Sequence, residues 1–179
     1  MHKDVKEILI THEEIEEKCK ELGKEISEHY KNREKPPILV ALLKGSVPFL
    51  AKLIQYIDLD IEYDFMDVSS YEGTESVRDV RILKDLDRSI KGEDILLVED
   101  IVDTGNTINE IIRLLLNKGA NECKVVSLLD KPSRREVEVN ADFVGFVIPN
   151  EFVIGFGLDF NEKYRNLPYV GILKDELYQ

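Results

Sequence analysis

The sequence has few of the residues that build disulfides, zinc sites or membrane spans. It has only two cysteines, Cys19 and Cys123, which lie far apart and show no pairing framework, so we expect a reducing, cytoplasmic compartment. Its three histidines all precede residue 30 and lie outside any recognisable motif, and no CxxC or HxxxH spacing suggests zinc. No run approaches the roughly 20 apolar residues of a membrane span. We therefore expect a soluble protein with no membrane partner.

Positive charge is also scarce, because 24 Lys and Arg residues face 36 Asp and Glu residues, giving a formal net charge of −12. Nucleic acids and anionic membranes are bound by basic surfaces that release counterions, so neither is an expected partner. A small anionic substrate is still compatible with this charge. A few backbone amides, a few Lys or Arg side chains and a metal ion can reverse the local field.

The length and composition predict one domain, residues 1–179. A chain of 179 residues fits the usual size of a single domain, and 43% hydrophobic residues are enough for a buried core. No internal repeat or linker interrupts the sequence.

Strand-like and helix-like segments alternate along the chain. Thr11 and Glu14 form a capping box ahead of a helical apolar repeat, Ser46 is the expected N-cap of a helix that runs to about Ile57, and Gly119 should end a helix over residues 106–118. Strands are expected at residues 38–43, 61–65, 80–83, 95–98, 124–129 and 142–148. This order predicts an α/β fold, a mostly parallel twisted sheet flanked by helices, with ligands at the carboxyl ends of the strands.

The most informative stretch is V-E-D-I-V-D-T-G-N-T, residues 98–107, which follows a buried strand and leads into a helix. Its second half offers small and hydroxyl-bearing residues where helix amides are unpaired, an arrangement that suits a phosphate monoester. Gly105 lets the backbone approach closely. Glu99 and Asp100 would repel a phosphate unless they bind sugar hydroxyls or a hard cation. The alternative is that these residues only cap the following helix.

This stretch closely resembles the phosphoribosyl pyrophosphate motif of type I phosphoribosyltransferases. From about residue 8 to its end the chain resembles the hypoxanthine-guanine branch, bacterial type, in segments 42–46, 69–71, 127–131, 151–155 and 158–168. The resemblance implies purine salvage: transfer of the 5-phosphoribosyl group from phosphoribosyl pyrophosphate to hypoxanthine or guanine, giving IMP or GMP plus pyrophosphate. It also implies a small hood formed by the chain ends and a flexible lid loop within residues 69–79.

The resemblance further implies the ligands of phosphoribosyl pyrophosphate and of a Mg²⁺ cofactor. The substrate ligands are Lys44, Gly45, Ser70, Tyr71, Glu99, Asp100, Asp103, Thr104, Gly105, Asn106, Thr107 and Arg165. Glu99, Asp100 and Asp159 are the expected magnesium contacts, and the Leu43–Lys44 peptide bond can be cis in this family. Taken alone, Lys44 also fits an ordinary exposed lysine at a strand end.

Asp103 is the expected catalytic residue, a general base or hydrogen-bond acceptor at purine N7, although it could also serve as N-cap of the following helix. Purine-binding residues implied by the resemblance are Lys131, Phe152, Val153 and Asp159. The ammonium of Lys131 would donate to O6, so adenine would leave it without an acceptor. Phe152 would stack on the base, or alternatively belong to the core. Arg135 is a further candidate that the adjacent Arg134 matches equally well.

Three alternatives stay open. An RNA-binding transcriptional regulator on the same scaffold would need a basic face, which the charge disfavours. A related enzyme could use xanthine instead. A non-catalytic α/β binding module is the third, and the intact set of acidic and basic motif residues argues against it. By resemblance the chain should form a homodimer or homotetramer.

Overall fold

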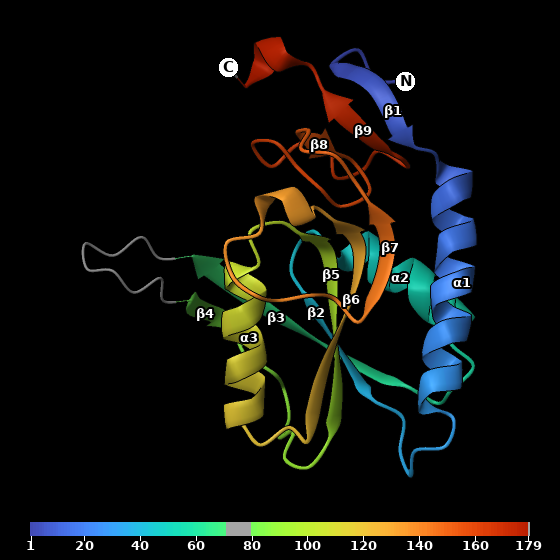
Figure 1. Cartoon of the computed structure of the whole chain (residues 1–179), viewed down its shortest axis with the longest axis vertical. Coiled ribbons are helices and arrows are strands. Elements are labelled where there is room, and N and C mark those ends of the chain that lie inside the picture. The colour runs from blue at the N-terminus through green and yellow to red at the C-terminus, as the bar shows by residue number, and fades with distance from the viewer. Residues whose placement is uncertain (71–79, 179) are drawn as a thin grey trace.

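The protein is described by a computed structural model over residues 1–70 and 80–178 (Figure 1). Within these residues a larger sheet has the strand order β4-β3-β2-β5-β6-β7, and a smaller one the order β1-β9-β8. The strands of the larger sheet are β2 (Ile38–Leu42), β3 (Glu62–Ser70), β4 (Val80–Lys84), β5 (Asp94–Val102), β6 (Glu122–Asp130) and β7 (Phe143–Val147). Its helices are α1 (His12–Tyr30), α2 (Val47–Leu53) and α3 (Asn106–Asn117).

The larger sheet is parallel from β3 through β2, β5 and β6 to β7, and only the edge strand β4 runs antiparallel. The carboxyl ends of the parallel strands therefore meet at one edge of the sheet, where a ligand is expected in such folds. This arrangement confirms the predicted fold class.

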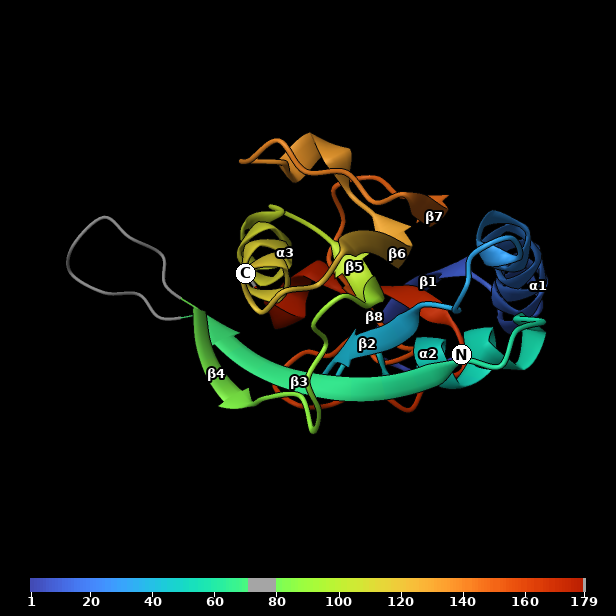
Figure 2. The ribbon, with the colours of Figure 1, turned by 90° about the horizontal axis from the view of Figure 1, so that it is seen from below.

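Helices cover both faces of the sheet, α3 on one side and α1 with α2 on the other (Figure 2). Alternate residues of each strand point to opposite faces. Val40 and Leu97 pack in the core that holds Ile111 of α3, and their strand neighbours pack in the core that holds α1 and α2. Both faces are buried, which explains the continuous apolar runs in β2 and β5.

The helix ends follow the predicted signals with one exception. Thr11 and Glu14 form the expected capping box of α1. The amides of Gly119 and Ala120 donate to Leu116 O and Leu115 O, which closes α3 in a Schellman motif. The exception is Ser46, which occupies the predicted N-cap position of α2 but donates its hydroxyl to Leu42 O and makes no side-chain cap bond. The predicted extent to Ile57 is met by α2 and a following 3₁₀ turn, Ile54–Tyr56.

The smaller sheet is the hood above the carboxyl ends of the strands, with both termini beside it (Figure 1). It contains β1 (Val5–Ile10), β8 (Val153–Ile154) and β9 (Val170–Leu173). Strand β1 pairs antiparallel with β9, and β9 with β8. The hood predicted from the resemblance is confirmed, although its individual strands were not predicted.

Two predicted boundaries are wrong. Ser69 and Ser70 belong to β3, where they pair with Arg81 and Val80 of β4, so the loop does not begin at residue 69. Strand β5 extends past Val98 to Val102, which places Glu99 and Asp100 inside the strand. The remainder of the predicted lid, residues 71–79 including Tyr71, lies outside the described residues. In the described part of the chain, no helix is long and apolar enough to cross a membrane.

Candidate active site

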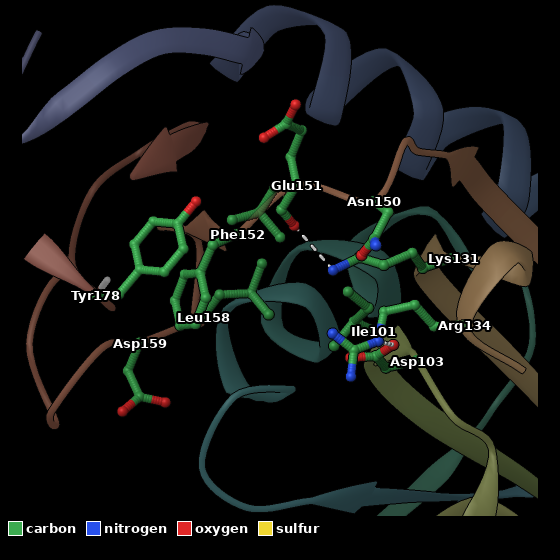
Figure 3. Close-up of a pocket in the computed structure, with 11 residues that line it drawn as sticks. Ile101, Asp103, Lys131, Arg134, Asn150, Glu151, Phe152, Leu158, Asp159 and Tyr178 are labelled. Atoms are coloured by element: carbon green, nitrogen blue, oxygen red, sulfur yellow. Dashed lines mark hydrogen bonds and ion pairs between the residues drawn. The ribbon is translucent and has the colours of Figure 1, made fainter. Parts of the chain in front are cut away.

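A cavity of about 380 Å³ lies between the carboxyl ends of β5 and β6 and the hood (Figure 3). It brings together five predicted residues: Asp103, Lys131, Phe152, Val153 and Asp159. The other lining residues are Ile101, Arg134, Asn150, Glu151, Leu158 and Tyr178. The residues predicted to bind pyrophosphate, Lys44, Gly45 and Arg165, are not among its lining residues.

Lys131 directly follows β6, and its backbone amide donates to Val102 O of β5 (2.9 Å). The side chain is 5% exposed, and its Nζ donates to Glu151 O at 2.9 Å, as the dashed line in Figure 3 shows. Burial lowers the pKa of Lys131, while the negative charge of Asp103 opposes that shift. An ammonium carries three donors, so a ligand acceptor in the cavity can bind here as well.

Phe152 borders the cavity and also packs against the hood core, so it is partly a core residue, and its stacking on a base stays a prediction. Its ring stacks on Tyr178, with ring centroids 4.9 Å apart and an interplanar angle of 29°, and meets Phe160 edge-on. The Tyr178 hydroxyl donates to Asp175 Oδ1 (2.9 Å), which fixes that ring. Sequence reasoning missed Tyr178, and an aromatic residue at a chain end is its only local signal.

Asp103 has an unusual environment. Arg134 Nε lies 3.1 Å from Asp103 Oδ1 as an ion pair (Figure 3), yet this buried oxygen has no hydrogen-bond donor among the described residues. The side chain as a whole is 38% exposed and faces the cavity. The alternative role as N-cap is wrong, because Gly105, with φ +85°, occupies that position. The Asp103 carboxylate therefore borders the cavity, while its buried Oδ1 is held by the charge of Arg134.

Arg134 and Arg135, equivalent candidates in the sequence, have different partners. Arg135 forms a largely buried ion pair with Asp130 and donates from Nη1 to Asp103 O at 2.6 Å. It therefore ties the end of β6 to the loop after β5. Among the described residues, the ion pair recorded for Arg134 is with the Asp103 side chain, and Arg134 lines the cavity.

The loop at residues 103–107 is covered by the segment that follows Arg135. A Cβ on Gly105 would lie 2.4 Å from Val139 Cγ1, so no side chain fits there. The Asn106 side chain donates to Glu136 Oε2 (2.7 Å), and Glu136 N donates to Thr104 O (2.9 Å). The first amide of α3 with a partner four residues back is that of Asn109. Before it, the amide of Asn106 donates to Thr104 Oγ1 (3.4 Å), and no partner is recorded among the described residues for the amides of Thr107 and Ile108.

Glu99 and Asp100 form a pair of carboxyl groups with raised pKa values. Burial raises the pKa of Glu99 well above its ordinary value, and the charge of Asp100 adds to this; burial also raises the pKa of Asp100. Two such groups fit a hard cation, and Mg²⁺ typically binds one or two carboxylates together with water and substrate phosphates. No three acidic, histidine or cysteine residues of the described chain form a metal cluster. Asp159 thus lies apart from Glu99 and Asp100. Its Oδ1 lies 3.0 Å from Arg165 Nη2.

Three segments of backbone meet at Gly45. A Cβ on Gly45 would lie 1.7 Å from Asp100 Oδ2, and a Cβ on Gly157 would lie 1.9 Å from Gly45 O. The peptide bond between Leu43 and Lys44 is cis, as the resemblance suggested. Only glycine fits at both positions. The turn after β2 thereby lies against the end of β5 and against the hood loop that carries Asp159 and Arg165.

The predicted pyrophosphate ligands Lys44 and Arg165 lie near one another. Lys44 Nζ donates to Glu162 Oε2 (2.8 Å), and Arg165 Nη2 contacts Glu162 Oε1 (3.1 Å). Arg165 also donates to Gly157 O (2.8 Å), while its Nε is buried without a partner among the described residues. Of the remaining predicted ligands, Ser70 is the last residue of β3. Glu162 was not predicted, because it carries the wrong charge for an anion site.

The comparisons with known proteins agree over the whole chain. The sequence pattern described as "Phosphoribosyl transferase domain" matches residues 5–161. The hypoxanthine-guanine phosphoribosyltransferase of Lactococcus lactis is 53% identical, covering 99% of this chain and 96% of the relative. The bifunctional protein TilS/HprT of Listeria monocytogenes is 50% identical over 99% of this chain, which spans only 27% of that longer protein.

Solved structures are equally similar. A hypoxanthine phosphoribosyltransferase from Staphylococcus aureus superposes with a TM-score of 0.94 at 50% identity, covering 100% of this chain and 97% of the other. The hypoxanthine phosphoribosyltransferase of Trypanosoma cruzi, solved in complex with the product IMP, has a TM-score of 0.94 at 39% identity, with 99% of each chain covered.

The contrast between the two arginines is testable by unfolding. Replacing Arg135 by Ala leaves Asp130 and Asp103 O without their partner and should cost about 2–3 kcal/mol of unfolding free energy. The matched control, Arg134→Ala, removes a half-exposed ion pair and should cost about 0.5 kcal/mol or less. Denaturant titration of both variants measures the difference. Equal losses would contradict the role given to Arg135.

Proposed function

The chain belongs to the phosphoribosyltransferase family, and we propose that it is a purine salvage enzyme that transfers the 5-phosphoribosyl group from phosphoribosyl pyrophosphate to hypoxanthine or guanine. The products are IMP or GMP and pyrophosphate. The observation that carries this proposal is the cavity, where the Asp103 carboxylate and the buried Lys131 ammonium lie beside the Phe152 ring. A 6-oxopurine supplies a ring N–H, an O6 acceptor and a flat face for these three groups.

One half of the site, which we call the base half, binds the purine. The base stacks on Phe152, O6 accepts a hydrogen bond from Lys131 Nζ, and the backbone of Val153 reads the base edge. Asp159 provides a carboxylate near the base. As purine N9 attacks C1 of the ribose and pyrophosphate leaves, Asp103 accepts the proton or the hydrogen bond of N7. The Asp103 side chain is 38% exposed and borders the cavity, so a bound purine can approach the carboxylate, whose buried Oδ1 pairs with Arg134.

The phosphate half holds the sugar and its two anionic ends. The amides and hydroxyls of residues 104–107 bind the 5-phosphate at the start of α3. Glu99 and Asp100 hold the ribose hydroxyls and contribute to a Mg²⁺ site, and Lys44, Gly45 and Arg165 bind pyrophosphate. Bound magnesium supplies charge that neutralises the leaving pyrophosphate. Burial raises the pKa values of Glu99 and Asp100, and a bound cation would favour the ionised forms of both groups.

Several wider features belong to the same proposal. Residues 1–179 form one domain, supported by the core that Ile10 and Ile172 of the hood share with Leu39 of the larger sheet. The enzyme works in the cytoplasm, in keeping with its free cysteines. It forms a homodimer or homotetramer, for which the exposed Val47, Tyr63 and Leu83 offer apolar surface. The net charge of −12 disfavours nucleic acid and anionic membranes as partners.

A spectrophotometric panel tests the reaction. Hypoxanthine, guanine, xanthine and adenine are each supplied with phosphoribosyl pyrophosphate and Mg²⁺. Turnover is expected with hypoxanthine and guanine. Turnover mainly with xanthine would move the chain to the xanthine-using alternative, and no turnover with any base would contradict an enzymatic role.

Asp103→Asn keeps the shape of the side chain but removes its basicity. It should lower kcat by roughly 10²–10⁴-fold, with a smaller effect on the KM for phosphoribosyl pyrophosphate. Steady-state kinetics of the variant, with its melting temperature as a check on folding, provide the measurement. A near-normal kcat would mean that another group handles the proton.

Lys131→Met removes the donor to O6 while keeping an unbranched side chain. Because the lost hydrogen bond is charge-assisted, binding of 6-oxopurines should weaken roughly ten- to a hundredfold, and discrimination against adenine should relax. Lys124→Met is the matched control, since Lys124 lies on β6, the strand that Lys131 follows, but pairs with Asp142. Unchanged ratios of kcat/KM among the four bases would rule out a hydrogen bond from Lys131 to O6.

A further inference from the structure

A single carboxylate lies between the two cations assigned to pyrophosphate. Each oxygen of Glu162 contacts a different cation: Oε2 accepts from Lys44 Nζ (2.8 Å), and Oε1 lies 3.1 Å from Arg165 Nη2. Lys44 follows β2, whereas Glu162 and Arg165 lie 118 and 121 residues further along the chain, in the hood loop. A phosphate group bound by a lysine and an arginine would use the same pair of cations.

The hood loop itself sets where Glu162 lies. Glu162 and its neighbour Asn161 both have left-handed backbone, with φ of +62° and +52°, which residues other than glycine rarely adopt. The amide of Glu162 donates to Asp159 Oδ2 at 2.9 Å, closing the turn. The left-handed backbone and this hydrogen bond therefore fix the position from which the Glu162 side chain extends toward Lys44 and Arg165.

The charge of Glu162 is maintained by the same cations. Hydrogen bonds from Lys44 and Arg165 lower the pKa of Glu162, so the side chain stays ionised at neutral pH. Arg165 keeps two other partners, Gly157 O and Asp159, and would remain in place without Glu162. For Lys44, Glu162 is the one ion-pair partner recorded among the described residues.

We propose that Glu162 is an internal competitor of pyrophosphate: its carboxylate neutralises Lys44 and Arg165 in the free enzyme and is displaced when the pyrophosphate end of the substrate binds. This inference rests on the proposed function, which assigns both cations to pyrophosphate. Its consequence is that the site binds pyrophosphate less tightly than its cations alone would allow, which favours release of that product.

Glu162→Gln tests this directly, because it removes the charge and keeps the size of the side chain. The affinity for pyrophosphate with Mg²⁺, measured by calorimetry, should rise about three- to tenfold, the scale expected for two exposed ion pairs. The KM for phosphoribosyl pyrophosphate should fall similarly, and the KM for the purine should not change. Glu28→Gln is the control: it removes an equally exposed carboxylate that pairs with Lys31 at the far end of α1.

A second variant, at Lys44, distinguishes a failure of this inference from a failure of the proposed function on which it rests. Lys44→Gln should weaken pyrophosphate binding if Lys44 is a ligand, and the gain from Glu162→Gln should shrink in that background. No effect of Lys44→Gln would contradict the assignment of Lys44 itself. If Lys44→Gln weakens binding while Glu162→Gln leaves it unchanged or weakens it too, Glu162 is no competitor, and the inference is overturned.

Discussion

The parallel ladder between β5 and β6 is the constraint on which the site depends. Its register pairs Val102 with Asp130, and the Lys131 amide extends it by one more bond to Val102 O. The residues that leave these two strands, Asp103 and Lys131, must therefore emerge side by side at the same edge of the sheet. The buried Lys131 ammonium and the Asp103 carboxylate then border one cavity. Arg135 reinforces the arrangement, since it bonds both to Asp130 and to the backbone of Asp103.

The hood forms one wall of the cavity at this edge. Val153 of β8 and Phe152 just before it border the cavity, and the loop after β8 returns to the sheet, where Gly157 meets Gly45. The contact between Gly157 and Gly45 therefore places the base half of the proposed site next to its phosphate half. Under the proposed function the electrostatics follow the same division. The chain has a net charge of −12, yet helix amides, Lys44 and Arg165 would bind the anionic substrate, and Glu99 and Asp100 would contribute to a cation site.

The sequence predicted the larger sheet well, because its strands are buried on both faces and read as apolar runs. It underestimated β5 and β3, whose polar ends, Glu99 to Asp100 and Ser69 to Ser70, continue the ladder despite their composition. The hood strands escaped prediction because β1 pairs with β9 across nearly the full chain, Val5 with Leu173, and short strands carry no local signal. Family resemblance supplied the residues of the cavity. It could not separate Arg134 from Arg135 or find Tyr178 and Glu162, since their partners are set by tertiary contacts.

The central claim is that one cavity reads the purine while the adjoining helix start binds the phosphate. A crystal structure of this protein with IMP tests it most directly. The account predicts the base stacked on Phe152, with O6 within hydrogen-bond distance of Lys131 Nζ and N7 beside Asp103. The 5-phosphate should lie on the amides of residues 104–107. A base bound away from Lys131, or a phosphate bound away from the start of α3, would contradict it.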